Sequence, residues 1–244
     1  MEVRGLERRR YNEFLKRLKS LAEEDYKSFS GKITPGSCAR IMGVRVPALR
    51  SIAKEIAKDR PEEFIGYVLS SLEKEKMTHE EIVVFGLVIG YAKFDFNKFC
   101  EFAAAFSEYV CNWACCDVPV SSFKLIAKYT EEYKPEAERL LKSPNPWVQR
   151  VGVVTLLDYY LESPENAEYA LNMINNLSSD EYYVMMAQAW LIATAAAKQR
   201  DIAVDFLKRG TSLSSDVKKM TIRKIRDSFR ISPDDKELLS GLLG

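Results

Sequence analysis

Apolar residues recur at intervals of three and four positions along almost the whole chain. Tyr11, Phe14, Leu15, Leu18 and Leu21 show this spacing near its start. Such spacing places apolar side chains on one face of an α-helix, whereas the apolar–polar alternation that is typical of strands is hard to find. The sequence therefore predicts an all-α protein.

Proline, glycine and helix-capping residues divide the chain into about a dozen helical segments of about 8–20 residues. A new helix is expected to start at each of these breaks. The breaks are SGKITPGS (30–37), DRP (59–61), KPE (134–136), SPNP (143–146), ESPEN (162–166), LSSDE (177–181), RGTSLSSD (209–216) and ISPDD (231–235).

Three of the expected helices resemble one another, and they cover residues 147–157, 183–193 and 216–226. Val148, Val184 and Val217 fall in register, 36 and then 33 residues apart. A period in this range with two helices per unit is typical of an α-solenoid. The sequence predicts a single HEAT-like repeat domain over 1–244, in which 1–35 form an N-terminal helix and linker and 36–244 form the repeat array.

Basic residues gather in three segments, although the formal net charge is only +1. Lys and Arg outnumber acids by seven to two in 4–19, by six to two in 36–60 and by ten to four in 198–230. A segregated charge of this kind can present a basic face to a polyanion such as nucleic acid. Solvated helix faces are the alternative, and charge alone favours them.

The chain shows no pattern of secretion or membrane insertion. MEVRGLERRR is charged and leads into an amphipathic segment, unlike a secretory signal. The nearly apolar run 82–92 is shorter than the roughly 20 residues that cross a bilayer, so it predicts a buried helix. Five cysteines without regular spacing fit a reducing compartment. We expect a cytoplasmic protein.

The stretch CNWACCD holds three of the five cysteines and invites comparison with a metal site. Structural zinc sites need four thiolate or imidazole ligands. Cys111 and Cys115 share a helix face, but Cys38, Cys100 and the sole histidine, His79, lie far from them in the sequence. The pattern favours buried thiols over a metal site or a cysteine nucleophile.

Trp113 and Asp117 are also four residues apart, so the indole and the carboxylate stand one turn apart on one side of a helix. Spacing alone favours a core tryptophan beside a surface acid that caps the next helix. Trp147 and Trp190 occupy apolar segments that are typical of core positions. Arg150 is an isolated cation in an apolar run, and it needs a buried partner, a groove or an anionic ligand.

Four short segments resemble, in order, the signature segments of the AlkD-type DNA alkylation repair proteins. They are GVRVPALR (43–50), NWACCD (112–117), WVQRVGVV (147–154) and YYVMMAQAWLIA (182–193). The resemblance covers about residues 36–230. It implies a C-shaped HEAT-like α-solenoid whose basic concave face holds double-stranded, alkylated DNA, and a DNA glycosylase that excises N3- and N7-alkylated purines without a cofactor.

The resemblance also implies roles for individual residues. By motif, Trp113, Asp117 and Trp190 correspond to the catalytic residues, and Arg150 corresponds to an arginine beside the DNA backbone. We expect further DNA contacts from cations of the basic segments, and no metal in a monomeric protein. These cations are Arg45, Arg50, Lys218, Lys219, Arg223 and Lys224.

Two features depart from the family pattern. AlkD-type glycosylases carry additional N-terminal helical structure that touches the duplex, whereas here we expect a single basic helix over about residues 6–28. Ala193 stands where those enzymes have an arginine after the second tryptophan. A non-catalytic binder of bent, branched or damaged DNA and a protein-binding helical scaffold therefore stay open as alternatives.

Overall fold

The computed structural model describes residues 2–37 and 39–244. Over these residues the regular structure is helical, with one isolated bridge between Arg40 and Thr78. This confirms the all-α prediction. Internal contacts divide the chain into unit 1, Met1–Leu125, and unit 2, Ile126–Gly244, and each is described by itself.

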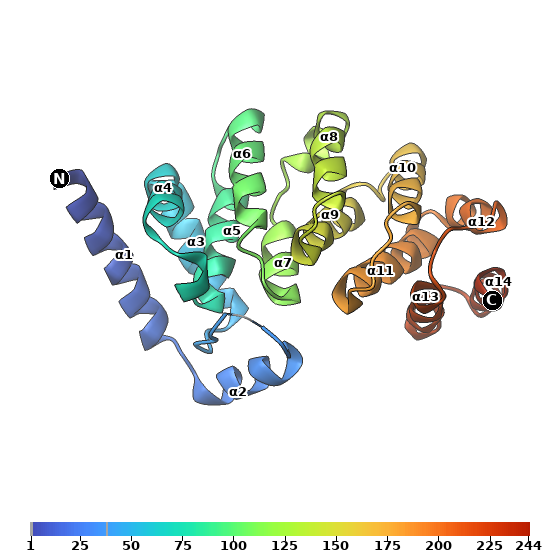
Figure 1. Ribbon diagram of the computed structural model, residues 1–244, viewed down its shortest axis with the longest axis horizontal. Helices are drawn as coiled ribbons and strands as arrows, with labels where there is room; N and C mark the ends of the chain where they lie inside the picture. The colour runs from blue at the N-terminus through green and yellow to red at the C-terminus, as the bar shows by residue number, and fades with distance from the viewer. Residues whose placement is uncertain (1, 38) are drawn as a thin grey trace. The chain divides into compact units, whose positions relative to one another are not determined.

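Unit 1 contains layered helix pairs (Figure 1). α3, α5 and α7 pack side by side in one layer, α4 and α6 lie against α5 in a second layer, and α1 packs on α4. This layering is that of HEAT-like repeats. The helices are α1 (Glu2–Ser20), α2 (Glu24–Ile33), α3 (Val46–Asp59), α4 (Pro61–Ser71), α5 (His79–Tyr91), α6 (Phe96–Ser107) and α7 (Trp113–Val120).

α5 is the central helix of unit 1, and all of its residues from His79 to Ile89 are buried. This confirms the buried helix predicted from the apolar run. Gly86 allows α7 to approach α5 closely: an added Cβ there would lie 2.5 Å from Pro119 Cβ and 2.6 Å from Phe106 Cε2. The close packing of α7 against α5 therefore requires glycine at position 86.

We expect Gly86→Ala to lower the free energy of unfolding by about 1–3 kcal/mol, the usual cost of overpacking a core. Urea unfolding checks this. Gly66→Ala in α4 is the matched control, because nothing lies within 4 Å of a Cβ added there. That variant should be stabilised by about 0.5–1 kcal/mol, as alanine favours the helix over glycine. Equal effects of the two substitutions would contradict the close approach of α5 and α7.

The N-terminal region forms two helices, so the single helix expected over about 6–28 is wrong. α1 ends at Ser20 and α2 begins at Glu24. Glu23 between them has an extended backbone, with φ −118° and ψ 124°, and its N–H donates to Gly43 O over 2.9 Å. Gly43 has φ +99°, and a Cβ there would clash with Glu23 O. A contact with a distant segment therefore interrupts the helix.

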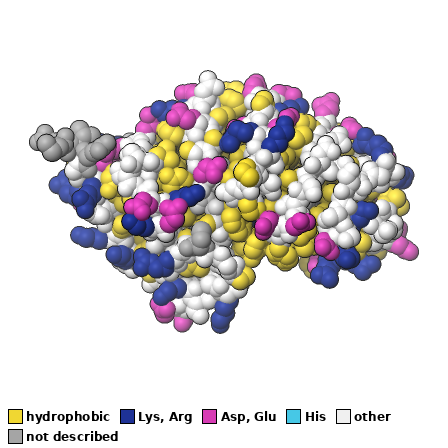
Figure 2. All heavy atoms as spheres, viewed as in Figure 1, with side chains coloured by type: hydrophobic (Ala, Val, Ile, Leu, Met, Phe, Trp, Pro, Cys, Tyr) yellow, Lys and Arg dark blue, Asp and Glu magenta, His cyan; other side chains and the backbone are white. Residues whose placement is uncertain are grey.

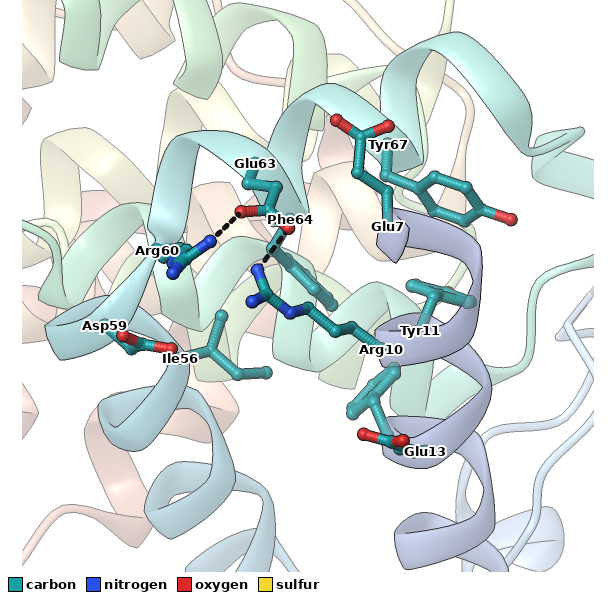
Figure 3. A pocket seen from close by; sticks show the side chains of 11 residues that line it. Glu7, Arg10, Tyr11, Glu13, Ile56, Asp59, Arg60, Glu63, Phe64 and Tyr67 are labelled. Atoms are coloured by element: carbon teal, nitrogen blue, oxygen red, sulfur yellow. Dashed lines mark hydrogen bonds and ion pairs between the residues drawn. The ribbon is translucent and has the colours of Figure 1, made fainter. Parts of the chain in front are cut away.

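Aromatic packing fastens α1 to α4 (Figure 3). The ring of Tyr11 stacks on Phe64 at 5.8 Å between centroids, and Phe14 meets Phe64 edge-on at 5.4 Å. Arg10 Nη1 also donates to Glu63 Oε1 over 2.5 Å. Because partly exposed ion pairs contribute only about 0–1 kcal/mol, the rings supply most of the attachment.

Unit 2 has the same layered arrangement (Figure 1). α9, α11 and α13 pack side by side, α10, α12 and α14 form the second layer, and α8 packs on α9. The aligned valines, Val148, Val184 and Val217, are all buried. The helices are α8 (Thr130–Leu141), α9 (Pro146–Tyr159), α10 (Pro164–Asn175), α11 (Tyr182–Lys198), α12 (Arg200–Lys208), α13 (Ser215–Asp227) and α14 (Pro233–Leu243).

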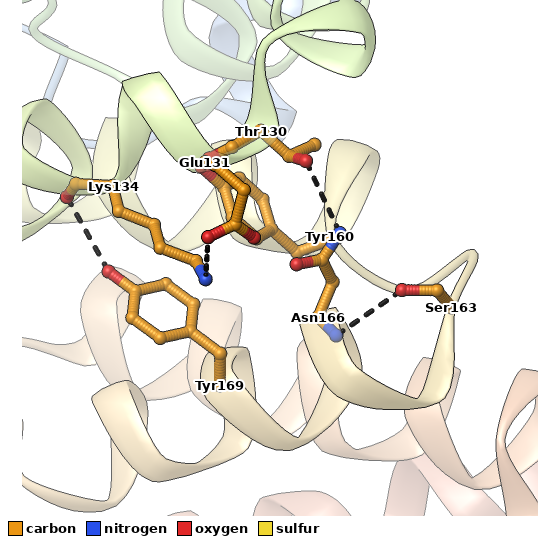
Figure 4. Close-up of polar contacts among 7 residues, drawn as sticks. All are labelled: Thr130, Glu131, Lys134, Tyr160, Ser163, Asn166 and Tyr169. Atoms are coloured by element: carbon orange, nitrogen blue, oxygen red, sulfur yellow. Dashed lines mark hydrogen bonds and ion pairs between the residues drawn. The ribbon is translucent and has the colours of Figure 1, made fainter.

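Most of the predicted breaks in unit 2 begin helices, but KPE does not. α9, α10 and α14 start with a proline after a capping Asn or Ser, as expected. Pro135 instead lies inside α8. Tyr160 Oη donates to Thr130 O over 2.6 Å, and Tyr169 Oη donates to Lys134 O over 3.5 Å (Figure 4). These contacts from Tyr160, which directly follows α9, and from Tyr169 of α10 hold the turn before Pro135 in place.

Candidate functional site

α7 carries the CNWACCD stretch and separates its residues into two faces. The side chain of Asn112 caps the helix by accepting from Cys115 N over 2.9 Å. Cys115 and Cys116 are buried, as is Cys111 just before the helix, whereas Trp113 and Asp117 are partly exposed. The prediction of buried thiols is confirmed for these three, whereas Cys100 in α6 is only half-buried. Cys38 lies outside the described residues. Trp113 and Asp117 are thus among the partly exposed residues of α7.

The indole of Trp113 is held in one orientation. Its Nε1–H donates to the carbonyl of Ile33, the last residue of α2, over 2.9 Å. Because the polar edge of the ring is engaged, the ring presents its electron-rich faces, which attract cations. α2 therefore supports a residue of the candidate site.

Asp117 lies within α7, so the predicted alternative in which it caps a helix that follows it is wrong. Arg50 of α3 braces this helix from one side: its guanidinium donates to Val118 O over 3.3 Å and to Ser121 Oγ over 3.1 Å. A third bond runs from Arg50 Nη1 to Tyr91 Oη over 2.7 Å. Arg50, which we expected to contact DNA, thus also holds α3, α5 and α7 in register.

Arg45 stabilises the non-helical segment between α1 and α2. Its guanidinium forms a two-point contact with the Glu23 carboxylate at 2.9 Å, and it lies 4.8 Å from the centre of the Tyr26 ring. This contact lowers the pKa of Glu23, chiefly through the hydrogen bond from Arg45. Exposed Lys and Arg side chains also cover α1 (Figure 2).

In unit 2, Arg150 lies in α9 and is only 5% exposed. Its Nη1 donates to Tyr183 O at the start of α11 over 2.5 Å. The Trp147 ring packs on the Tyr183 ring, with 5.2 Å between centroids. The expected buried partner of Arg150 therefore includes the backbone carbonyl of Tyr183, and Trp147 packs on the ring of the same residue.

Trp190 is not a core tryptophan, because 36% of its surface is exposed in the middle of α11. The ammonium of Lys224 in α13 lies 6.0 Å from the centre of its ring, within the range of a weak cation–π contact. The residue one turn later on the same side, Ala193, is 7% exposed. Unit 2 thus brings together an accessible indole and one of the predicted DNA-binding cations.

The remaining predicted cations, Lys218, Lys219 and Arg223, share α13 with Lys224. Lys219 and Arg223 are exposed, and Lys219 Nζ lies 3.4 Å from Asp216 Oδ1. Exposed pairs of this kind are weak and break readily in favour of a polyanion. These side chains form a basic surface of α13.

A buried polar cluster connects α5 to the start of α7. Asn112 Nδ2 lies 3.2 Å from His79 Nδ1 and donates to Ser37 Oγ over 2.9 Å, and Cys115 Sγ lies 3.2 Å from the same nitrogen of His79. Burial raises the pKa of the Cys115 thiol and lowers the pKa of His79. Because the thiol stays protonated, the geometry does not support a cysteine nucleophile.

We expect the pKa of His79 to lie below 6.5, its ordinary value. Below about pH 6.5 the unfolded chain takes up a proton that the folded chain resists, so the free energy of unfolding falls as the pH drops towards the folded pKa. Because His79 is the sole histidine, one imidazole resonance in the NMR spectrum of tag-free protein reports it. A His79 resonance that titrates at or above 6.5 would contradict the burial.

Neither a metal cluster nor a membrane-spanning helix is found in the part of the chain that the structure describes. No three His, Cys, Asp or Glu side chains among residues 2–37 and 39–244 are placed to hold a metal ion together. No helix in those ranges has the length and apolar character needed to cross a bilayer.

Comparison with known proteins decides the family. The model of the DNA alkylation repair enzyme family matches residues 14–230. The chain belongs to this family. The match confirms the resemblance found in the sequence and extends it to include the C-terminal part of α1 and all of α2. Comparison with curated proteins finds no match. Membership of the DNA alkylation repair enzyme family assigns the protein to DNA repair, with DNA as its partner.

α2 belongs to the candidate site, although no sequence motif indicates it. Tyr26, Phe29 and Ile33 recur at intervals of three and four and so share one face of this helix. Phe29 and Ile33 are 54% and 41% exposed, and the Ile33 carbonyl holds Trp113. The spacing of these apolar residues indicates that they share a helix face. The break before α2 cannot be predicted from local sequence.

Proposed function

We propose that the protein is a DNA glycosylase that excises N3- and N7-alkylated purines from double-stranded DNA. The observation that carries the proposal is the division of α7 into two faces, with the thiols buried and Trp113 and Asp117 accessible. Family membership supplies the context of DNA alkylation repair.

The chemistry requires little acid catalysis, because an alkylated purine already carries a positive charge. When the N-glycosidic bond breaks, the purine keeps the bonding electron pair and leaves as a neutral base. Positive charge then develops on the deoxyribose. Water forms the new bond to the anomeric carbon and releases its proton. The protein has to stabilise the sugar cation and position the water.

We assign these tasks to the accessible side chains. The Asp117 carboxylate supplies negative charge opposite the developing positive charge and orients the water. The face of the Trp113 indole, on the same helix as Asp117, attracts the cationic sugar. The cations of α13 hold phosphates, because guanidinium and ammonium groups form charge-assisted hydrogen bonds to them. Arg150 is only 5% exposed, so we assign it to the support of the start of α11 through Tyr183 O.

A second function is favoured by one observation. Ala193 provides no side-chain charge one turn beyond Trp190, where AlkD-type glycosylases have an arginine. A protein that binds bent, branched or damaged DNA without cutting the glycosidic bond would need the cations of α13 but not Asp117.

Duplex DNA that contains N7-methylguanine or N3-methyladenine separates the two functions. A glycosylase should release the free base, detected by chromatography, faster than spontaneous depurination in buffer. Binding that weakens as salt is raised, without base release above that background, would overturn the glycosylase proposal and support the non-catalytic binder.

A further inference from the structure

The turn between α13 and α14 presents one phenylalanine entirely to solvent. Phe229 is 104% exposed, and the next most exposed large apolar side chain among the described residues is Phe29, at 54%. A ring left fully in water adds no burial to the stability of the fold. Phe229 is therefore a candidate contact with a partner.

The turn holds the backbone of Phe229 in a defined position. Ile225 before it and Ile231 after it are 0% and 7% exposed, so both ends of the turn are anchored in the core. Ser228 N donates to Ile225 O over 3.2 Å, and Arg230 N donates to Ser228 Oγ over 3.2 Å. A contact residue whose backbone is already positioned loses little backbone entropy on binding.

The charges around Phe229 indicate the kind of partner. Residues 223–230 contain four cations and one acid, Asp227. Arg226 and Arg230 flank the ring in sequence and are exposed. Like charges disfavour a second copy of this surface, whereas a polyanion is attracted to it. The turn also continues directly from the part of α13 where Lys224 lies 6.0 Å from the Trp190 ring.

We propose that Phe229 inserts into the base stack of double-stranded DNA where the stacking is interrupted, while Arg226 and Arg230 hold the neighbouring phosphates. Opening an intact base-pair step costs about as much as one stacked ring returns. Insertion is therefore favourable at a gap, an abasic site or another defect, and not in a regular duplex. The inference needs DNA binding but not base excision, so it fails or succeeds separately from the proposed glycosylase activity.

Binding to two duplexes tests the inference, one intact and one with a single tetrahydrofuran abasic analogue, by fluorescence anisotropy. Wild-type protein should bind the abasic duplex more tightly. Phe229→Ala should weaken that binding by about 5- to 150-fold, the range for loss of one stacked aromatic ring, and should remove the preference. Phe229→Trp should keep it. Arg226→Ala and Arg230→Ala should weaken binding to both duplexes and each lower the salt slope by about 1.

Leu69→Ala is the control, because it removes an exposed apolar side chain from α4, which carries no residue of the candidate site, and it should leave the preference unchanged. The inference is overturned if Phe229→Ala binds both duplexes as wild type does, if the wild-type protein binds neither, or if sedimentation shows that Phe229→Ala changes self-association and not DNA affinity.

Discussion

Release of N7-methylguanine from duplex DNA is expected to fall about 100- to 1,000-fold when Asp117 is replaced by asparagine. Asparagine keeps the shape of the side chain but removes the negative charge that we place opposite the sugar cation. The range is typical of removing one preorganised electrostatic contact to a transition state. Single-turnover rates with enzyme in excess measure the effect on the chemical step, and the affinity for intact duplex should change little.

Asp59→Asn is the matched control for this prediction. Asp59 is an exposed acid at the end of α3, in the same unit as Asp117. The substitution removes the same charge from the surface, so it should leave the single-turnover rate within about twofold of wild type. If both variants release the base equally fast, Asp117 has no electrostatic role in the reaction.

The second large effect is expected at Glu80, whose carboxylate is 1% exposed. Its two oxygens accept from the backbone N–H groups of Met42, Gly43 and Val44 over 2.9, 2.7 and 3.2 Å. These three donors belong to the segment that leads into α3. Glu80 therefore holds the segment before α3 against α5. Because Arg50 lies in α3 and donates to Val118 and Ser121, the position of α7 also depends on Glu80.

Glu80→Ala should lower the free energy of unfolding by about 3–5 kcal/mol, because it leaves backbone donors without an acceptor. That is a large share of the roughly 5–15 kcal/mol by which domains are stable. Urea unfolding of the full chain measures it. Glu75→Ala, which removes an exposed acid just before α5, should stay within about 0.5 kcal/mol of wild type. Similar losses for both variants would show that the Glu80 carboxylate does not hold this segment.

Local sequence predicts much of this fold because the helices are strongly periodic. The apolar run 82–92 gave α5 as a buried helix, and the aligned Val148, Val184 and Val217 all lie in the core. The separation of Trp113 and Asp117 from the thiols also follows from helical geometry, since residues four apart share a face. Alternatives remained because spacing cannot tell which face is accessible.

What local sequence could not predict depends on distant contacts. The break before α2 exists because Glu23 bonds to Gly43 and Arg45. Pro135 lies within α8 because the tyrosines of a later segment hold the preceding turn. The exposure of Phe229 depends on where Ile225 and Ile231 meet the core, and no residue near Phe229 signals it in advance.

The affinity for a duplex in which a positively charged pyrrolidine ring replaces one deoxyribose tests the central claim most directly, because this ring mimics the sugar cation. The uncharged tetrahydrofuran analogue is the reference. Mimics of a transition state bind at least about 100-fold more tightly than the ground state. We predict that wild-type protein prefers the charged ring and that Asp117→Asn loses most of this preference. Equal affinity of the wild-type protein for the two duplexes would contradict the role assigned to Asp117.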